Sequence, residues 1–549
     1  MTLWGNKKDD EEEQANEATP TNGERQPRQA EVDERTRLLP PPAAGREGYL
    51  DPDDPAVSTQ LSAAAVIRAT QPTANQTQVS PYNLWSVRLL RYLTVLFAIL
   101  TFLWWVLLLV SIFISPPGMH SRGSGFFDFS YTTLTLGLLL VGLLFFATPS
   151  KAAQISCLII SVILLADAII IVSVPRLRIE EGWVGIASVI WALFISIWTV
   201  VTDRTVAWGK HEEEERLTGR QENRRTLREW CSVLTSTAVL VIIAIVAFLL
   251  SATLILRARD ASLPSPGQKY YVDGDKYQIH VYCEGNHTNT HGKKLPTVLF
   301  EAGYGPFEHT MIQVAQNSIK NGSISRYCYA DRPGIGFSEN APSPFSAATA
   351  ASVLSEALAR AGEDGPWILA SAGVGSIYSR VFSSRHGSEV HGLLLIDPLH
   401  EDLLYRLGSA NRGFLLWAWG IISPLGLDRV PAAIFKGRSR QDRVIGKSAY
   451  QNGKFIKAKL QEALVANSLT KDEVRSSRNI QLKDTPLVLI SSGINIRKDT
   501  DWNHKQRDLS HLTNNLVGWD IVSKAPSEVW STYEGRQVIE KRLKELVYA

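Results

Sequence analysis

Few residues of this sequence stand in a pattern that is typical of a chemical function. The four cysteines and 11 histidines do not show the spacing of a metal site. No glycine-rich loop of the kind that cradles phosphate groups occurs. Nothing suggests nucleic-acid binding, and the net charge is only +3. We therefore expect no cofactor, no metal ion and no nucleic-acid partner.

The cysteines divide between two halves of different character. Cys157 and Cys231 belong to a strongly apolar half, whereas Cys283 and Cys328 form a pair in a mixed half of globular composition. Such a pair is typical of a domain in an oxidising compartment, where disulfides persist. Two unrelated free thiols are the alternative.

One acidic residue lies inside an otherwise apolar stretch. Asp167 is flanked by Leu165, Ala166 and Ala168. An unpaired carboxylate there would cost about 3 kcal/mol or more in a membrane, so we expect it to face other helices. It is either a proton or ligand site, or a neutral acid bonded to a hydroxyl or to a partner subunit. We prefer the second interpretation.

Five segments carry the roughly 20 apolar residues that a membrane-spanning helix needs. They are 92–114, 129–147, 152–174, 183–201 and 233–256. Together they predict a transmembrane region at 84–257. Buried helices of a soluble protein are excluded, because the rest of the chain could not cover so many helices that are apolar all round.

Basic residues near the helix ends predict the orientation. Arg88 and Arg91 precede the first span, and the loop at 203–231 is rich in lysine and arginine. Cytosolic loops carry this excess, so the N-terminus and that loop are expected in the cytosol. Five crossings then place everything after Arg257 in a lumen, in a vacuole or outside the cell. The sequons at Asn286 and Asn321 agree with glycosylation there.

Residues 1–83 are rich in charged residues and proline, which predicts a disordered cytosolic tail. The acidic start resembles neither a secretory leader nor a mitochondrial presequence, so the first span is expected to direct insertion. Glu34, Leu38 and Leu39 resemble an acidic dileucine signal, which would recruit a sorting adaptor and direct the chain to a vacuole or lysosome. A chance match is the alternative.

From residue 268 onward, short apolar runs alternate with helical stretches. The expected strands are 277–283, 297–300, 325–330, 367–370, 392–396 and 486–490. This alternation predicts an α/β domain with a mostly parallel sheet at 268–549. An insert at about 403–477 is typical of a helical lid, and it could lie against the membrane.

Three motifs in this half resemble those of the α/β-hydrolase superfamily. They are VLFEAGYG at 298–305, YADRPGIGFS at 329–338 and LLIDP at 394–398. Together with the membrane region, the chain resembles fungal integral membrane proteins with such a domain. The resemblance implies an oxyanion-type loop at Gly303, Tyr304 and Gly305. It also makes the second and fourth strands neighbours, which implies a disulfide between Cys283 and Cys328.

The nucleophile of this superfamily lies on the strand-to-helix turn Gly-x-Ser-x-Gly. Here the turn reads SAGVG at 371–375, which puts Gly373 at the nucleophile position. Glycine has no side chain that could attack a substrate. Ser371 is two residues early and Ser376 is one turn late, so both are weak substitutes.

The histidine that acts as the general base in this superfamily is also missing from its expected position. The last histidines, His504 and His511, precede the final strand, and Ser527 stands about where the histidine is expected. A hydroxyl cannot act as a general base near neutral pH. Asp499 or Asp501 could match the acid, but neither orients a base without the histidine.

Three further residues of the globular half are assigned structural roles. Asp397 ends the strand of the LLIDP motif, and we interpret it as structural. His309 and His400 are interpreted as surface or capping histidines.

These observations predict a membrane-anchored, lumenal α/β-hydrolase-type domain that is a pseudoenzyme. It would bind a small molecule, a lipid or a protein under its lid. One alternative is an active membrane-bound serine hydrolase with an unconventional nucleophile. The other is a structural or transport-associated subunit in which Asp167 is the working residue. Among locations, an endomembrane of the vacuole or lysosome is favoured.

Overall fold

The computed structural model describes residues 84–218, 226–288, 293 and 295–548. The tail at 1–83, with Glu34, Leu38 and Leu39, lies outside the described residues.

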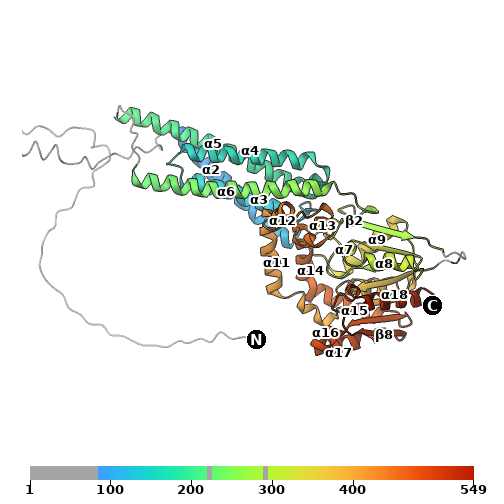
Figure 1. Cartoon of the computed structure of the whole chain (residues 1–549). Coiled ribbons are helices and arrows are strands. Elements are labelled where there is room, and N and C mark those ends of the chain that lie inside the picture. Colours follow the sequence, from blue (N-terminus) through green and yellow to red (C-terminus); the bar gives the residue numbers. More distant parts are fainter. Residues whose placement is uncertain (1–83, 219–225, 289–292, 294, 549) are drawn as a thin grey trace, which may run out of the picture. The chain divides into compact units, whose positions relative to one another are not determined.

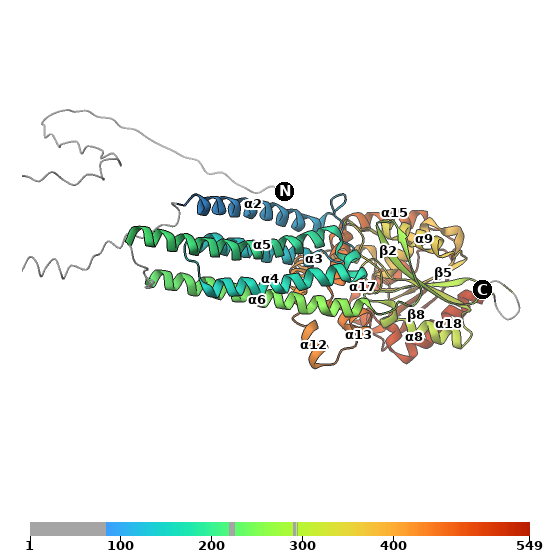
Figure 2. The same cartoon turned by 90° about the horizontal axis from the view of Figure 1, so that it is seen from above.

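The first part of the described chain consists of long apolar helices that run side by side (Figures 1 and 2). They are α2 (Trp85–Phe113), α3 (Phe126–Leu144), α4 (Lys151–Ser173), α5 (Pro175–Thr218) and α6 (Leu227–Ala261). Five described helices are long and apolar enough to cross a membrane, as predicted. Most extend beyond the predicted apolar windows, because a helix satisfies its backbone hydrogen bonds whether or not its side chains are apolar. α5 bends at Gly182, which has a φ of +63°.

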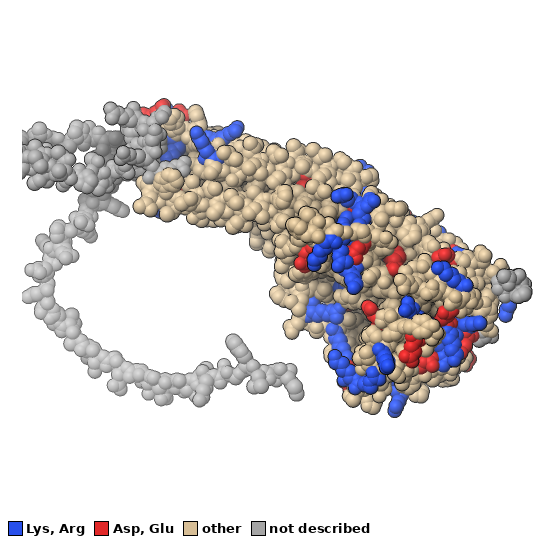
Figure 3. All heavy atoms as spheres, in the orientation of Figure 1, with Lys and Arg blue, Asp and Glu red and all other residues tan. Residues whose placement is uncertain are grey.

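Polar side chains of this region point at neighbouring helices, and many of its apolar side chains point outward. Ser161 donates a hydrogen bond to Ser196 at 2.9 Å, and the Trp104 indole donates one to Ser188 at 3.1 Å. Ile169, in contrast, is 57% exposed. Helices in hydrocarbon show this arrangement. Figure 3 agrees, because few charged side chains appear over these helices on the face drawn.

The second part is built on an eight-stranded sheet with the order β1-β2-β4-β3-β5-β6-β7-β8. β2 is antiparallel to both of its neighbours, and the pairs from β4 to β8 are parallel. The strands are β1 (Gln268–Val272), β2 (Tyr277–Gly285), β3 (Thr297–Glu301), β4 (Arg326–Ala330), β5 (Trp367–Ala372), β6 (Val390–Ile396), β7 (Leu487–Ser492) and β8 (Leu516–Val522). This is the strand order of the α/β-hydrolase fold, and it confirms the predicted fold class.

Alternate residues of the central strands enter two separate cores. Leu369 and Leu393 pack in one core and Ile368 and Leu394 in the other, because successive side chains of a strand point to opposite faces. Helices cover both cores. They include α8 (Ile312–Lys320), α9 (Ala347–Ala361), α10 (Gly375–Arg385) and α18 (Tyr533–Tyr548).

The insert between β6 and β7 is largely helical, as predicted. Its helices are α11 (Ala410–Ile422), α12 (Arg429–Phe435), α13 (Arg440–Val444), α14 (Gly453–Val465) and α15 (Lys471–Ile480). α11 and α14 pack together, and α11 also contacts α3. The insert therefore contacts both the sheet domain and the membrane helices.

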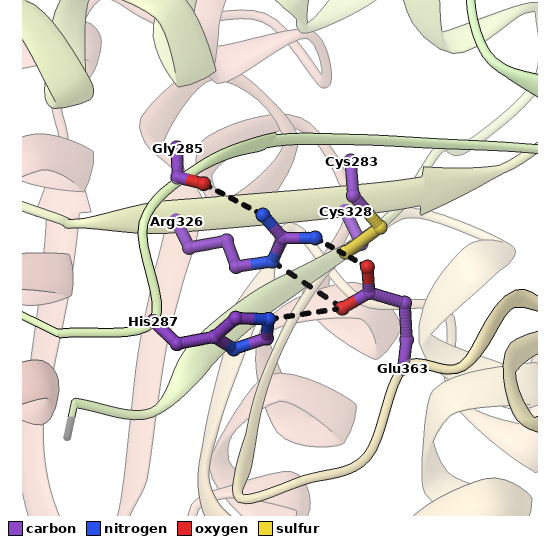
Figure 4. The surroundings of a disulfide bond; sticks show 6 residues. All are labelled: Cys283, Gly285, His287, Arg326, Cys328 and Glu363. Carbon is purple, nitrogen blue, oxygen red and sulfur yellow. Dashed lines mark hydrogen bonds and ion pairs between the residues drawn. A yellow bond between two sulfur atoms is a disulfide. The ribbon is translucent and has the colours of Figure 1, made fainter.

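A disulfide joins β2 to β4 (Figure 4). Cys283 and Cys328 are direct partners in the antiparallel register and are bonded, with their Cα atoms 4.1 Å apart. Beside them, Arg326 donates hydrogen bonds to the backbone carbonyl of Gly285 at 2.6 Å and to Glu363. The predicted pairing of these cysteines is confirmed.

Removal of this disulfide is expected to destabilise the sheet domain. Cys283→Ser together with Cys328→Ser should lower the free energy of unfolding by about 2 to 4 kcal/mol, because the bond closes a long loop in the unfolded chain. Chemical unfolding of the purified protein measures this change. Cys231→Ser, at an exposed free cysteine, is the control and should leave stability unchanged. An equally small effect of the double variant would contradict the prediction.

Candidate functional site

The turn between β5 and α10 has the backbone of a nucleophile elbow but no side chain at its apex. Gly373 has a φ of +51°, and its N–H donates to the carbonyl of Ile396 at 3.0 Å. A Cβ atom on Gly373 would meet only the Cα of Gly303, at 3.9 Å. The turn therefore has room for a side chain and lacks one.

The two nearby serines are placed differently from a nucleophile. Ser371 is paired within the sheet with Glu301 and Leu395, is fully buried, and its hydroxyl has no hydrogen-bond partner among the described residues. The hydroxyl of Ser376 donates to the carbonyl of Gly373 at 2.6 Å. Neither serine is hydrogen-bonded to a histidine in the described part of the chain.

Asp397 and Ser527 are linked through Asn495. Asp397 follows β6 and accepts hydrogen bonds from the backbone N–H of Ser492 at 3.1 Å and from the Trp502 indole at 3.0 Å. The Asn495 amide donates to Asp397 at 2.8 Å and to the Ser527 hydroxyl at 2.6 Å. Burial raises the pKa of Asp397 despite these donors. The Asn495 amide thus bonds both the acid and Ser527, and neither Asn495 nor Ser527 can act as a general base near neutral pH.

The other two acids considered from the sequence, Asp499 and Asp501, lie at the start of a helix. Asp499 caps α17 (Thr500–Leu509) by accepting from the N–H of Trp502 at 3.2 Å, and it pairs with Arg406 at 2.6 Å. Asp501 lies exposed in the first turn of the same helix. An Asp directly before a helix is a capping signal that the sequence contained.

His400 also caps a helix, as interpreted from the sequence. Its Nδ1 accepts from the N–H of Asp402 at 3.0 Å, and its Nε2 lies 2.7 Å from Asp508. His309 is exposed, with its ring 6.4 Å from that of Tyr450.

Lid residues contact the oxyanion-type loop, in which Tyr304 is 48% exposed. The Tyr304 ring stacks on Tyr450 with 5.7 Å between centroids, and the Lys459 ammonium of α14 lies 4.7 Å from the Tyr304 ring. A Cβ atom on Gly305 would approach the Tyr450 hydroxyl to 2.0 Å. The absence of a side chain at Gly305 therefore allows Tyr450 of the lid to pack against this loop.

Buried charges hold the other side of the loop. Arg332 donates to Glu301 at 3.0 Å and to the carbonyls of Ala302 and Gly303. Its Nε lies 3.5 Å from Glu462 on α14. Burial raises the pKa of Glu301 to about 7, although Arg332 acts in the opposite direction. No motif in the sequence predicted this cluster, and the one available signal was Glu301, a glutamate at the end of an apolar strand.

Asp167 faces the interior of the helical region, as expected. It is fully buried, and the Tyr131 hydroxyl of α3 donates to it at 3.0 Å. The arrangement matches the preferred interpretation of an acid bonded to a neighbouring hydroxyl.

A second group of buried charges, not predicted from the sequence, joins the membrane helices to the lid. Arg257 of α6 pairs with Glu180 at 3.0 Å and with Glu181 at 2.5 Å. One turn later, Asp260 pairs with Arg429 at 2.7 Å and with Arg443 at 2.6 Å. The residues of the second group are far apart in sequence, so no local pattern predicts them.

Three groups of potential metal ligands lie close together in the described residues, and each already has partners. One contains Cys283 and Cys328, whose thiols are consumed by the disulfide. In another, the ring nitrogens of His280 contact Asp331 and the Pro266 carbonyl. The third contains His400, with the contacts described above. These groups therefore offer no histidine nitrogen or thiolate without a partner.

Comparison with known proteins places the chain in a family. An uncharacterized protein of Schizosaccharomyces pombe is 33% identical over 481 residues, which cover 82% of this chain and 89% of that protein. The chain belongs to the same family. Residues 34–283 match a family described as a region of unknown function (DUF2417). An uncharacterized vacuolar membrane protein of Saccharomyces cerevisiae is 27% identical over 386 residues, which cover 59% of each chain.

Solved structures similar to this family member are α/β hydrolases. An α/β-hydrolase enzyme from a deep-sea metagenome library is 12% identical with a TM-score of 0.37, covering 51% of this chain and 98% of that one. The Cif epoxide hydrolase from Acinetobacter nosocomialis is 12% identical with a TM-score of 0.40, covering 55% and 96%.

Helix α14 places lysines in the interior between the sheet domain and the membrane helices. The Lys454 ammonium donates to the carbonyl of Gly336 at 3.1 Å, and that of Lys457 donates to the carbonyl of Ile112 at the end of α2. Burial lowers the pKa of each lysine from its ordinary value of 10.5 to about 7. Both lysines therefore change charge near neutral pH.

Replacement of Lys457 should stabilise the protein more in acid than in base. Its pKa is lower in the folded than in the unfolded protein, so the penalty for burying the charge is complete below about pH 7 and decreases as pH rises toward 10.5. Lys457→Met should therefore raise the melting temperature more at about pH 5.5 than at about pH 9.5. Thermal unfolding at both pH values measures this, with exposed Lys483→Met as the control. An equal change at both values would refute the assignment.

Proposed function

We propose that this chain is a vacuolar-type membrane protein whose α/β-hydrolase-type domain lies in the lumen and binds a ligand without catalysing its hydrolysis. The observation that carries the proposal is Gly373, a residue without a side chain at the apex of an intact elbow. The hydrolysis typical of this fold requires a nucleophile at that point.

The surroundings of the elbow support the loss of catalysis. A serine nucleophile needs a base within hydrogen-bond reach, and the base needs an orienting acid. Here Asp397 is bonded to Asn495, which in turn contacts Ser527. A neutral amide cannot accept a proton from a nucleophile near neutral pH.

Ligand binding is supported by what the domain keeps. Arg332 donates a hydrogen bond to the carbonyl of Gly303 in the oxyanion-type loop. Lys459 and Tyr450 of the lid contact the ring of Tyr304. Buried charges of this kind cost free energy unless their geometry is well satisfied. A loop and a lid maintained without a nucleophile suit recognition of a small molecule, a lipid or a protein.

The location is supported by four independent features. The yeast relative is described as a vacuolar membrane protein. The disulfide suits an oxidising lumen, and both sequon asparagines, Asn286 and Asn321, are exposed. Basic residues gather in the segment 203–231, which favours the cytosol for that segment and the opposite, lumenal side for the sheet domain.

A fluorophosphonate probe tests the absence of a nucleophile. The full-length protein should remain unlabelled, while a serine hydrolase added to the same sample is labelled. Gly373→Ser is the matched variant, because a Cβ atom at this turn would meet only the Cα of Gly303, at 3.9 Å. It should also remain unlabelled, because Ser527 stands where the superfamily has its histidine and a hydroxyl cannot act as a general base near neutral pH. Labelling of the native protein that is lost in Ser371→Ala would overturn the proposal and establish an unconventional hydrolase.

Glycosidase treatment tests the topology. The native protein from its own cells should shift in mobility after removal of N-linked glycans, and Asn286→Gln with Asn321→Gln should abolish the shift. A protease that cuts at the loop 203–231 in sealed vesicles, with the cytosolic face outward, provides the complementary readout. Protection of that loop, with digestion of the sheet domain, would place the domain in the cytosol and contradict the proposal.

A further inference from the structure

Helix α11 of the lid packs one face on the membrane helices. The Trp417 ring lies 6.5 Å from that of Phe113 at the end of α2. Gly420 lies against Phe126, because a Cβ atom on Gly420 would approach the ring of Phe126 to 2.1 Å. α11 is therefore in direct contact with α2 and α3.

The length of α3 fixes the depth of this contact. α3 has 19 residues, Phe126–Leu144. At 1.5 Å per residue it spans about 28 Å, which is close to the thickness of the hydrocarbon core. The whole helix is needed to cross a bilayer, so its first residue, Phe126, lies at the membrane boundary. Gly420 of α11 lies at the same level.

The opposite face of α11 is apolar and exposed. Leu415 is 66% exposed, Trp419 45% and Ile422 39%, and Phe414, beside Trp417, is 62% exposed. A helix that is apolar on both faces is typical of a hydrophobic environment on both sides. The membrane helices supply a hydrophobic environment on one side of α11. The exposed face requires a second hydrophobic environment on the other side.

Helix α12 lies beside α6 and also exposes apolar side chains. Gly426, which precedes α12, lies against Thr253 of α6, and Arg429 is fixed by its ion pair with Asp260. Ile434 and Phe435 at the end of α12 are 67% and 84% exposed. The exposed basic residues Lys436, Arg438 and Arg440 follow directly.

We propose that α11 and α12 lie in the boundary of the same bilayer that the five helices span, with their exposed apolar side chains among the lipid acyl chains. Val110 of α2, the helix whose Phe113 contacts Trp417, and the following Ile114 are also exposed apolar residues. The basic residues after α12 then lie at the level of the headgroup phosphates, where cations bind anionic lipids. The occupant of this surface is lipid rather than a second copy of the chain or another protein.

Site-specific fluorescence in lipid nanodiscs tests this placement with the full-length chain. In a Cys231→Ser background, an environment-sensitive dye is attached to Leu415→Cys or Phe435→Cys. Nitroxides attached near the headgroup end of the acyl chains should quench both dyes strongly. Tyr533→Cys on α18, 72% exposed, is the matched control and should give an aqueous spectrum without quenching. Size-exclusion profiles identify variants that remain folded.

The outcomes separate this inference from the assumption on which it rests, the insertion of the five helices. Leu165→Cys on α4, 47% exposed, should be quenched by nitroxides deep in the bilayer. If it is quenched while Leu415→Cys and Phe435→Cys give aqueous spectra, the lid lies off the membrane and the inference is wrong. Blue-shifted dyes without lipid quenching would show a protein cover and would equally overturn it. Neither result bears on whether the domain is catalytic.

Discussion

Asp260 lies at the end of the last membrane helix, buried between two arginines of the lid. Its carboxylate contacts Arg429 and Arg443, and the preceding turn places Arg257 against Glu180 and Glu181. A charge buried without its partner is strongly unfavourable, whereas a satisfied pair is tolerated. The membrane helices and the lid therefore have to meet in one arrangement. Loss of Arg257 would remove the arginine that pairs with the buried Glu181, whereas loss of Arg429 or Arg443 would leave Asp260 with one arginine partner.

Helix α14 carries this constraint to the elbow of the sheet domain. Its Ile456 packs with the ends of the membrane helices, and its Lys457 donates to the backbone of α2. Its Lys459 lies over Tyr304 of the oxyanion-type loop. One helix thus contacts both the membrane region and the loop beside Gly373. The ends of the membrane helices and the loop at Gly303, Tyr304 and Gly305 are therefore connected through a few side chains of α14.

The sequence predicted the architecture because its signals were local. Apolar runs indicated the five helices, and short motifs indicated the sheet and the elbow. β1 was missed because this edge strand begins with Gln268 and Lys269 and is half exposed, so it lacks an apolar run. The contacts between Asp260 and Arg443, and between Asn495 and Ser527, join residues far apart in the chain. Such contacts depend on how the elements pack, and no spacing in the sequence reveals them.

The connection between α6 and β1 is short. α6 ends at Ala261 and β1 begins at Gln268, so six residues separate a membrane helix from the sheet. Six residues reach at most about 20 Å when fully extended. A domain on such a tether cannot explore the volume of its compartment. Its encounters with molecules in the membrane plane become two-dimensional searches at high effective concentration, whereas a freely dissolved molecule has to diffuse to the surface first.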